Sequence, residues 1–281
     1  MSEFIYTKTR PLNYSFNILV IFLFQIMSYN GYADIFWENL FSKYSLFNIV
    51  VIKGFFFYMS LFWLISSLYL LLDIFKFSKY LYSFKVQLAT EITISDIIKA
   101  SKIVLRNQLF GVLPVLYLYY KLLTKIDFSF NPKHTIFEDM KNFFWFCIIE
   151  EIWFYTFHRL AHHKYFYKHV HKMHHEYKAP FCLTAQYCSL IEQIVINITP
   201  LMLGPLIMQS HPHAILMWFL LSIVSALHSH SDYNFPFMAS VMFHDFHHYN
   251  YKGNYGVFVF MDKLFNTDKE YNKFKENYKK I

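Results

Sequence analysis

The sequence contains few charged residues and few cysteines, and both shortages narrow what the chain can be. Asp, Glu, Lys and Arg make up 16% of the 281 residues, whereas the hydrophobic share is 56% and the aromatic share 22%. Soluble domains usually carry about 25% charged residues, so this composition is typical of a membrane protein. The three cysteines form no CxxC pair and their number is odd, which argues against a disulfide framework and a zinc ribbon.

The sequence also lacks Pro-, Gly- or Ser-rich linkers, like-charge runs and internal repeats. We therefore expect a single domain, and the absence of inverted repeats argues against a transporter of that type. The net charge of +7 does not predict a nucleic-acid partner. Its lysines are scattered between apolar runs and cluster after residue 158, where they can face anionic lipid headgroups.

Several apolar runs are long enough to cross a bilayer, which takes about 20 residues. We predict an all-α integral membrane protein with four to six transmembrane helices. A lysine-containing connector over residues 76–102 is expected to lie on the membrane surface. The candidate spans are Tyr14–Tyr29, Ile49–Ile74, Leu190–Met208 and Ala214–Leu227, with the more polar Ile103–Leu123 and the aromatic-rich Asn142–Phe157 as weaker candidates.

Histidine is concentrated in HRLAHH at 158–163, HKMHH at 171–175 and HDFHH at 244–248, and HSH at 228–230 precedes the last cluster. An HxxHH pattern should arise by chance roughly 0.04 times in a chain of this length and histidine content, so two copies indicate function. Helical residues three and four apart share a face, and each cluster is therefore expected to present converging imidazoles. These are His158 and His162; His171, His174 and His175; and His244, His247 and His248.

Other histidines and three glutamates could also belong to the site that these imidazoles form. His228 and His230 would lie about 200° apart on a helix, so one of them can join easily, and we choose His230. Glu150, Glu151 and Glu192 lie in or beside apolar runs, where hydrogen bonds to ligand histidines would offset the cost of a carboxylate. Interfacial placement is an equal alternative for Glu150, and whether His228 or Glu192 joins the metal site stays open. The histidines read as bystanders are His134, His163, His169, His211 and His213.

The number of imidazoles indicates two metal ions. A zinc site takes four ligands, so eight or nine converging histidines are too many for one zinc. Imidazole also suits iron, copper and nickel, but zinc cannot reduce O2, and copper electron-transfer sites use a cysteine that these clusters lack. Soluble di-iron bundles use mostly glutamate ligands, which makes a histidine-rich pair a different kind of centre.

These residues resemble the fatty acid hydroxylase and sterol desaturase superfamily, which consists of membrane di-iron enzymes with HxxxH, HxxHH and HxxHH boxes. The resemblance runs from about residue 85 to 271 and is strongest at 150–181 and at 244–271, where NYG and DxLFxT follow the histidines. It implies one domain over 1–281, with membrane hairpins and a connector in 1–135 and a catalytic region with a cytosolic helical cap in 136–275. The implied ligands of two irons are His158, His162, His171, His174, His175, His230, His244, His247 and His248.

Two segments, APFCLTAQY at 179–187 and HSHSDYNFP at 228–236, are similar to the methylsterol-oxidase branch, which removes methyl groups at sterol carbon 4. The resemblance implies O2-dependent hydroxylation of a lipid C–H bond, with a sterol methyl group as the first choice, in sterol or lipid biosynthesis. Ser189-Leu190 in place of His-Pro, and Asp232 in place of Gly, depart from the branch and leave the substrate open.

Other functions remain as alternatives. They are a fatty-acyl or sphingolipid hydroxylase, a sterol desaturase, a sterol side-chain hydroxylase and, outside the enzymes, a divalent-metal transporter or sensor. A metalloprotease is disfavoured because HExxH is absent: Tyr177-Lys178-Ala179 follows His175-Glu176.

The rest of the sequence indicates the source of electrons and the location of the protein in the cell. The sequence has neither a GxGxxG motif nor the HPGG of b-type cytochromes, so electrons from NAD(P)H are expected through a separate b-type cytochrome or reductase. Lys and Arg flank the boxes, which predicts that the boxes face the cytosol. With a lipid substrate, this indicates a multi-pass protein of the endoplasmic reticulum membrane.

Overall fold

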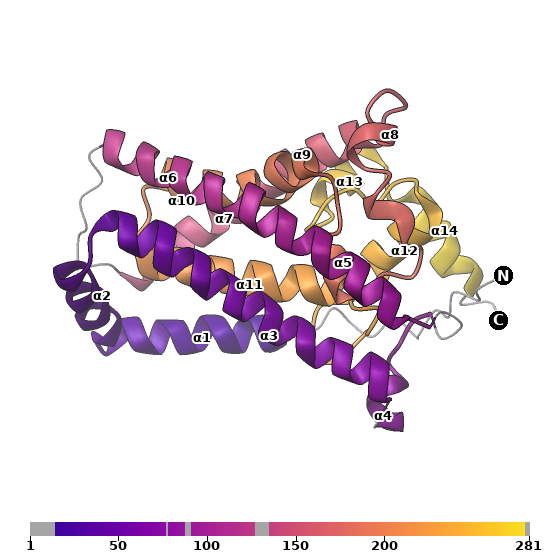
Figure 1. The fold of residues 1–281 in the computed structure, drawn as a ribbon, viewed down its shortest axis with the longest axis horizontal. Helices are drawn as coiled ribbons and strands as arrows, with labels where there is room; N and C mark the ends of the chain where they lie inside the picture. Colours follow the sequence, from indigo (N-terminus) through magenta and orange to yellow (C-terminus); the bar gives the residue numbers. More distant parts are fainter. Residues whose placement is uncertain (1–14, 77, 88–90, 127–134, 279–281) are drawn as a thin grey trace.

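The computed structural model describes residues 15–76, 78–87, 91–126 and 135–278, and within these ranges the chain is helical. One isolated antiparallel bridge, between Lys85 and Tyr233, is the β pairing among these residues. The long helices lie side by side along the longest axis, and the short helices α8, α12, α13 and α14 gather at one end (Figure 1). We call this end the cap.

Among the described residues, three helices are long and apolar enough to cross a membrane, and a fourth span results if the bent pair of α1 and α2 counts as one. The predicted all-α membrane fold is confirmed, with three or four spans where four to six were expected. The first two helices meet at an angle of 76°. The elements are α1 (Ser15–Tyr29), α2 (Tyr32–Lys43), η1 with α3 (Asn48–Phe75), α9 with η5 and α10 (Leu190–Met208), and α11 (Pro212–Ser229).

The two weaker candidates, Ile103–Leu123 and Asn142–Phe157, are helical but are not among these spans. The first lies in a continuous helix of α5 (Ile94–Asn107), the π-helical turn η2 (Gln108–Val112) and α6 (Leu113–Lys125). The second lies in α7 (Ile136–Ala161), which carries buried Glu150 and Glu151. Polar side chains of both segments, including Asn107, Gln108 and Glu151, are buried inside the protein.

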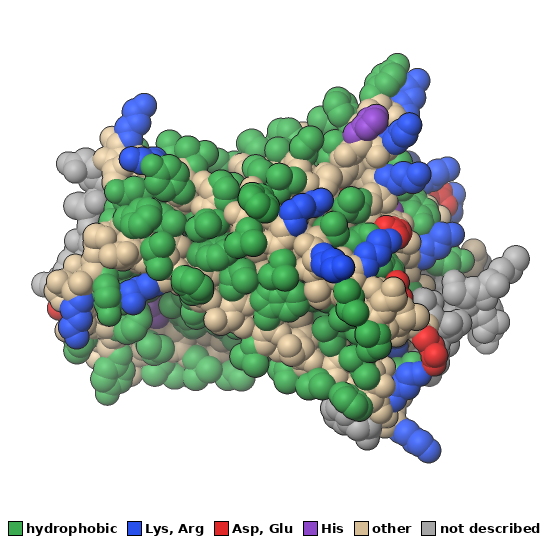
Figure 2. Space-filling view, in the orientation of Figure 1, with side chains coloured by type: hydrophobic (Ala, Val, Ile, Leu, Met, Phe, Trp, Pro, Cys, Tyr) green, Lys and Arg blue, Asp and Glu red, His purple; other side chains and the backbone are tan. Residues whose placement is uncertain are grey.

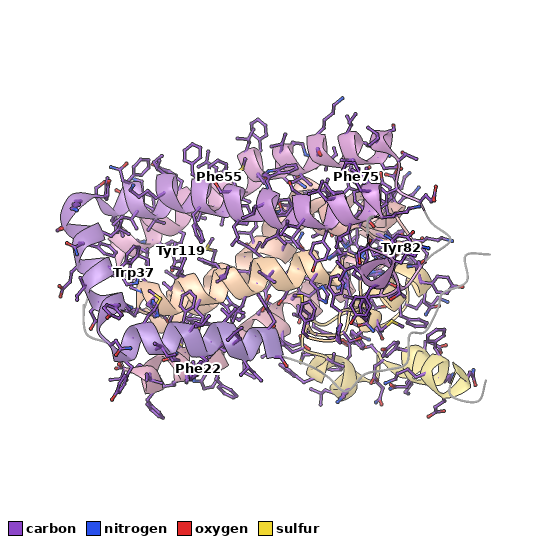
Figure 3. All side chains as sticks on the ribbon, turned by 90° about the horizontal axis from the view of Figure 1, so that it is seen from below. Phe22, Trp37, Phe55, Phe75, Tyr82 and Tyr119 are labelled. Carbon is purple, nitrogen blue, oxygen red and sulfur yellow. The ribbon has the colours of Figure 1, made fainter. Side chains whose placement is uncertain are left out.

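The surface has the character expected of a membrane protein. Hydrophobic side chains cover most of the visible face of the helix bundle, and most Lys and Arg side chains lie towards its two ends (Figure 2). Exposed aromatics such as Phe22 on α1 and Phe75 on α3 project from the bundle (Figure 3). Large apolar side chains on an outer surface are stable where lipid replaces water.

The connector packs against the bundle more closely than a surface helix would. Ala100 and Val104 of α5 are fully buried and join a core formed with α3, η4 and α11. A capping box of Thr93 and Asp96 starts α5, and a second capping box, formed by Thr135 and Glu138, starts α7. By fixing where α7 begins, this box helps to set the register of the helix that ends in the first histidine cluster.

The cap consists of short elements that follow α7 and α11. They are α8 (Tyr167–Val170), η3 (His174–Glu176), η4 (Cys182–Gln186), α12 (Met242–Asn250), α13 (Phe260–Phe265) and α14 (Lys269–Tyr278), and α4 (Lys79–Tyr82) lies in the connector. Every histidine cluster therefore belongs to a short element or to the end of a long helix.

Candidate metal centre

All nine predicted ligand histidines lie in the cap or at the adjoining ends of α7 and α11, and they form two groups, in each of which the candidate ligand atoms lie within 4.8 Å of one another. Neighbouring Nε2 atoms within a group are 2.9 to 3.3 Å apart. The first group is His158, His162, His171, His175 and His247, and the second group is His174, His230, His244 and His248.

The groups do not correspond to the sequence clusters, which corrects the expectation that each HxxHH cluster presents one converging face. In the second cluster, His171 and His175 enter the first group and His174 enters the second. In the third cluster, His244 and His248 enter the second group and His247 enters the first. Residues i and i+4 differ by about 40° around a helix, whereas i+3 and i+4 differ by about 100°. Each HxxHH cluster therefore supplies a pair to one group and a single ligand to the other.

The sequence predicted that the second cluster lies on a helix, but the structure shows no regular helix there. α8 ends at Val170, residues 171–173 form turns, and residues 174–176 form a 3-10 helix. The backbone N–H of His175 still donates to the carbonyl of His171, at 3.4 Å. This contact keeps the i to i+4 relation that brings the two side chains together.

Backbone carbonyls fix the tautomers of three of these histidines. The Nδ1–H of His158 donates to the carbonyl of Tyr255 at 2.7 Å, and that of His247 donates to the carbonyl of Gly253 at 2.7 Å. In the second group, Nδ1 of His230 donates to the carbonyl of Ala226 at 2.8 Å. A carbonyl can only accept, so the proton of each neutral ring lies on Nδ1 and the Nε2 lone pair faces the group.

Glu192 lies beside both groups. Its Oε1 is 2.9 Å from Nδ1 of His171 and 3.8 Å from Nδ1 of His174, and its side chain is buried. Glu192 thus lies next to two ligand histidines, whereas the predicted hydrogen bonds to His171 Nδ1 and His174 Nδ1 are not formed in this structure. Glu151 instead accepts hydrogen bonds from backbone amides of the C-terminal loop. Glu150 is buried, and the structure pairs it with no ligand histidine among the described residues.

The imidazoles are held in the neutral form that metal binding requires. Burial lowers the pKa of His230 to about 4. Burial, reinforced by neighbouring imidazoles, holds the pKa values of His174, His244 and His248 well below the usual histidine range. Metal ligation uses neutral imidazole nitrogen, so the second group presents its lone pairs at neutral pH.

The arrangement fits bound metal ions. The Nε2 atoms of His158 and His171 are 3.0 Å apart, and the proton of His158 is committed to the carbonyl of Tyr255. When the proton of His171 lies on Nδ1, which is 2.9 Å from Glu192 Oε1, neither Nε2 carries one. Two lone pairs at this distance repel unless a cation lies between them. Five imidazoles also exceed the four ligands of tetrahedral zinc.

The histidines read as bystanders and described by the structure lie outside both groups. His163 packs against Tyr165, and His169 is exposed on α8. His211 accepts from the backbone N–H of His213, whose Nε2 contacts the carbonyl of Phe24. His134 lies outside the described residues.

His228, the alternative to His230, is also outside the groups. Its Nδ1 hydrogen-bonds the hydroxyl of Tyr69 at 2.9 Å and its Nε2 contacts the carbonyl of Ala239 at 3.0 Å. Since both ring nitrogens already have partners, the structure favours His230.

A polar network that the sequence reading had missed joins the connector to the second and third clusters. The side-chain amide of Gln87 donates to Asp245, within the third cluster, and to the carbonyl of Lys178, each at 3.1 Å. The backbone N–H of Gln87 donates to Asp232, which also lies near the buried ammonium of Lys85. Burial raises the pKa of Asp245 to about 7.

The comparisons with known proteins identify a family and relatives of the chain. A family model described as fatty acid hydroxylase matches residues 143–267. The chain is 46% identical over 123 residues to fatty acid hydroxylase domain-containing protein 2 of Homo sapiens, covering 44% of this chain and 37% of that protein. The match therefore spans well under two thirds of that relative.

Two other relatives match over most of their length. Methylsterol monooxygenase 1 of Gallus gallus is 30% identical over 218 residues, covering 74% of this chain and 73% of that protein. Very-long-chain aldehyde decarbonylase GL1-11 of Oryza sativa subsp. indica is 32% identical over 254 residues, covering 84% and 91%. No solved structure matches significantly.

Proposed function

Because the chain belongs to the fatty acid hydroxylase family, we propose that it is a membrane-bound oxidoreductase that oxidises a lipid C–H bond with O2 and two iron ions. The observation that carries this proposal is the meeting of nine histidines in two adjacent groups. The first group would hold one iron through five imidazoles, and the second group would hold the other through four. When bound, the irons supply the activation of O2 and the oxidising power.

The protein residues hold and orient this centre. The carbonyls of Tyr255, Gly253 and Ala226 keep the Nδ1 protons of three ligands in place, so their Nε2 lone pairs stay directed inward. Glu192 would put a carboxylate beside both groups, where its negative charge would offset part of the charge of two metal ions. Burial of the histidines keeps water away from the reacting atoms.

The proposed substrate is a sterol methyl group at carbon 4. Support comes from the segments at 179–187 and 228–236 and from the relative named methylsterol monooxygenase 1, which this chain covers to 73%. The cap adjoins three apolar helices long enough to cross a bilayer. A substrate dissolved in the bilayer can therefore approach the cap without passing through water.

A long-chain lipid is the second candidate substrate. The relative named very-long-chain aldehyde decarbonylase is 32% identical and is covered to 91% of its length. The remaining alternatives are a fatty-acyl or sphingolipid hydroxylase, a sterol desaturase and a sterol side-chain hydroxylase, which differ in product. A metal transporter or sensor would bind the ions without oxidising a lipid.

We further propose that the protein resides in the endoplasmic reticulum membrane with its cap in the cytosol. Electrons from NAD(P)H would arrive through a separate b-type cytochrome or reductase. Basic side chains around the cap support this orientation, because cytoplasmic segments are enriched in Lys and Arg. They are Arg159, Lys164, Lys168, Lys172 and Lys178.

The test combines metal analysis with lipid analysis. Protein purified in mild detergent should contain about two metal ions per chain, and iron should be required for O2-dependent turnover. Lipid extracts of cells with and without the gene should differ in 4-methylsterols. Accumulation of long-chain aldehydes instead would favour the second candidate. Full turnover with a single zinc ion per chain would contradict the iron centre.

A further inference from the structure

The loop after α12 contacts ligands of one metal group. It contains the NYG sequence at 254–256, and two of its carbonyls accept from ligand histidines: Gly253 from His247 and Tyr255 from His158. Both histidines belong to the first group, although one lies on α12 and the other at the end of α7. The position of this loop therefore sets the orientation of two first-group imidazoles.

The side chain of Asp262 accepts hydrogen bonds from backbone N–H groups of the NYG sequence. Its Oδ1 accepts from the backbone N–H of Tyr255 at 2.9 Å and from the hydroxyl of Thr267 at 2.5 Å, and its Oδ2 accepts from the N–H of Gly256 at 2.6 Å. Asp262 is fully buried. Its carboxylate thus fixes the peptide group whose carbonyl orients His158.

Glu151 holds the following part of the loop. Its Oε2 accepts from the N–H groups of Val257 and Phe258, each at 2.7 Å, and its Oε1 accepts from Met261 at 3.1 Å. The carboxylates of Glu151 and Asp262 lie so close to Gly256 that a larger residue would not fit at this position. A Cβ there would lie 2.5 Å from Glu151 Oε1 and 2.9 Å from Asp262 Oδ2.

We propose that Asp262 and Glu151 are positioning residues for the first metal group. They act through the carbonyl of Tyr255, and Asp262 also acts through that of Gly253, because the hydroxyl of Thr267 donates to Asp262 and the carbonyl of Thr267 accepts from the N–H of Asn254 at 3.1 Å. We call Asp262, Glu151, Gly253 and Tyr255 the loop clamp. The inference rests on the proposed function, because it presumes that each histidine group binds a metal. It assigns a role to NYG and to the Asp and Thr of DxLFxT, which contain no metal ligand themselves.

Damage to the loop clamp should lower the metal affinity of the first group and leave that of the second group unchanged. In the second group, the Nδ1 of His230 is held by Ala226 of α11, and His174 lies beside Glu192. Neither contact involves the loop. Loss of an outer hydrogen-bond partner lowers metal affinity by about 10- to 100-fold, so a damaged clamp should weaken one of two sites by this factor.

The test is a Co2+ titration of the metal-depleted full-length protein in detergent, followed by absorption spectroscopy and metal analysis. Asp262→Asn replaces one carboxylate oxygen by an NH2 group, which then faces an N–H or O–H donor. We expect one Co2+ to bind as in the unaltered protein and the other to bind about 10- to 100-fold more weakly. Asp268→Asn is the matched control, since Asp268 accepts from Asn272 and not from the loop.

Thr267→Val provides a milder variant if Asp262→Asn does not fold, because it removes one donor to Asp262 and leaves the carboxylate. It should show the same one-site defect in smaller degree. The loop clamp is overturned if either folded variant binds Co2+ at both sites as the unaltered protein does, or if Co2+ binding is weakened equally at both sites. Failure of the unaltered protein to bind two ions overturns the proposed function instead, and the clamp with it.

Discussion

At the scale of single residues, the distribution of histidines between the two groups has a direct consequence for mutagenesis. His247 belongs to the first group and His174 to the second. Alanine at either position removes an imidazole that no neighbour replaces, so each variant should lose oxidation activity. Product formation and metal content in purified protein provide the measurement, and each variant should lose affinity mainly at its own site.

The controls are histidines outside both groups. His169→Ala changes an exposed side chain and should retain nearly full activity, as should substitutions of His134 and His213. Equal losses in ligand and control variants would indicate general destabilisation and contradict the assignment of the groups.

A second prediction concerns Glu192, whose Oε1 is 2.9 Å from His171 and 3.8 Å from His174. Glu192→Ala removes the carboxylate beside both groups, so both sites should bind metal about 10- to 100-fold more weakly. Glu192→Gln keeps an oxygen that can accept from His171 and should lose less. A defect confined to one group, measured by Co2+ titration, would contradict this shared role.

The residue scale also shows where prediction from sequence ends. The nine histidines could be identified because their spacing is improbable by chance, but their division between groups depends on how three elements meet. The partners of His158, His230 and His247 are backbone carbonyls. Every residue has such a carbonyl, so the amino-acid types do not show which one accepts the hydrogen bond. Asp232, which stands where the methylsterol-oxidase branch has Gly, adopts a φ of 64°, and this conformation favours glycine.

At the scale of elements, polar residues within apolar runs limited what local patterns could predict. The run at 103–123 was a weaker candidate span, and the structure has one helix there with a π-helical turn at Gln108–Val112. Asn107 donates its side-chain N–H to the carbonyls of Gln186 and Cys188. These partners lie about 80 residues away in the sequence, so local patterns could not reveal that the polar side chains are paired.

The contact between α7 and α10 provides a prediction for one element pair. A Cβ on Gly204 would lie 2.9 Å from Phe146 Cδ1 and 3.1 Å from its Cα, so Gly204→Ala should force the helices apart. Overpacking of this kind costs about 1–3 kcal/mol, and the midpoint of thermal unfolding in detergent should fall. Gly54→Ala is the matched control, because its nearest atom lies at 3.4 Å. A similar midpoint for both variants would contradict close packing at Gly204.

At the scale of the whole molecule, a buried ionic contact joins the connector to α3 and to the segment after α11. Lys85 of the connector lies 2.5 Å from Asp73 of α3 and 3.7 Å from Asp232, which follows α11. Composition and apolar runs could predict the membrane fold and three spans, since these features are local. They could not predict this contact, which joins three segments distant in the sequence and requires the finished fold.

The topology of the whole chain gives the last prediction. His175 and His230 contribute to adjacent groups, yet the helices Leu190–Met208 and Pro212–Ser229 lie between them in the sequence. A 19-residue helix is about 28 Å long, close to the hydrocarbon thickness of about 30 Å. We therefore expect the two helices to cross the membrane as a hairpin, which leads the chain away from the cap and back (Figure 1).

The turn of this hairpin and the C-terminal helix should consequently lie on opposite sides of the membrane. A glycosylation acceptor inserted near His211-Pro212-His213 should be modified in the lumen, and one inserted after Phe274 in α14 should stay unmodified. Gel mobility before and after deglycosylation measures this, with retained activity showing that each insertion variant folds. Modification after Phe274 would reverse the proposed orientation. An unmodified turn together with a modified tail would place the cap in the lumen, beyond the reach of a cytosolic electron donor.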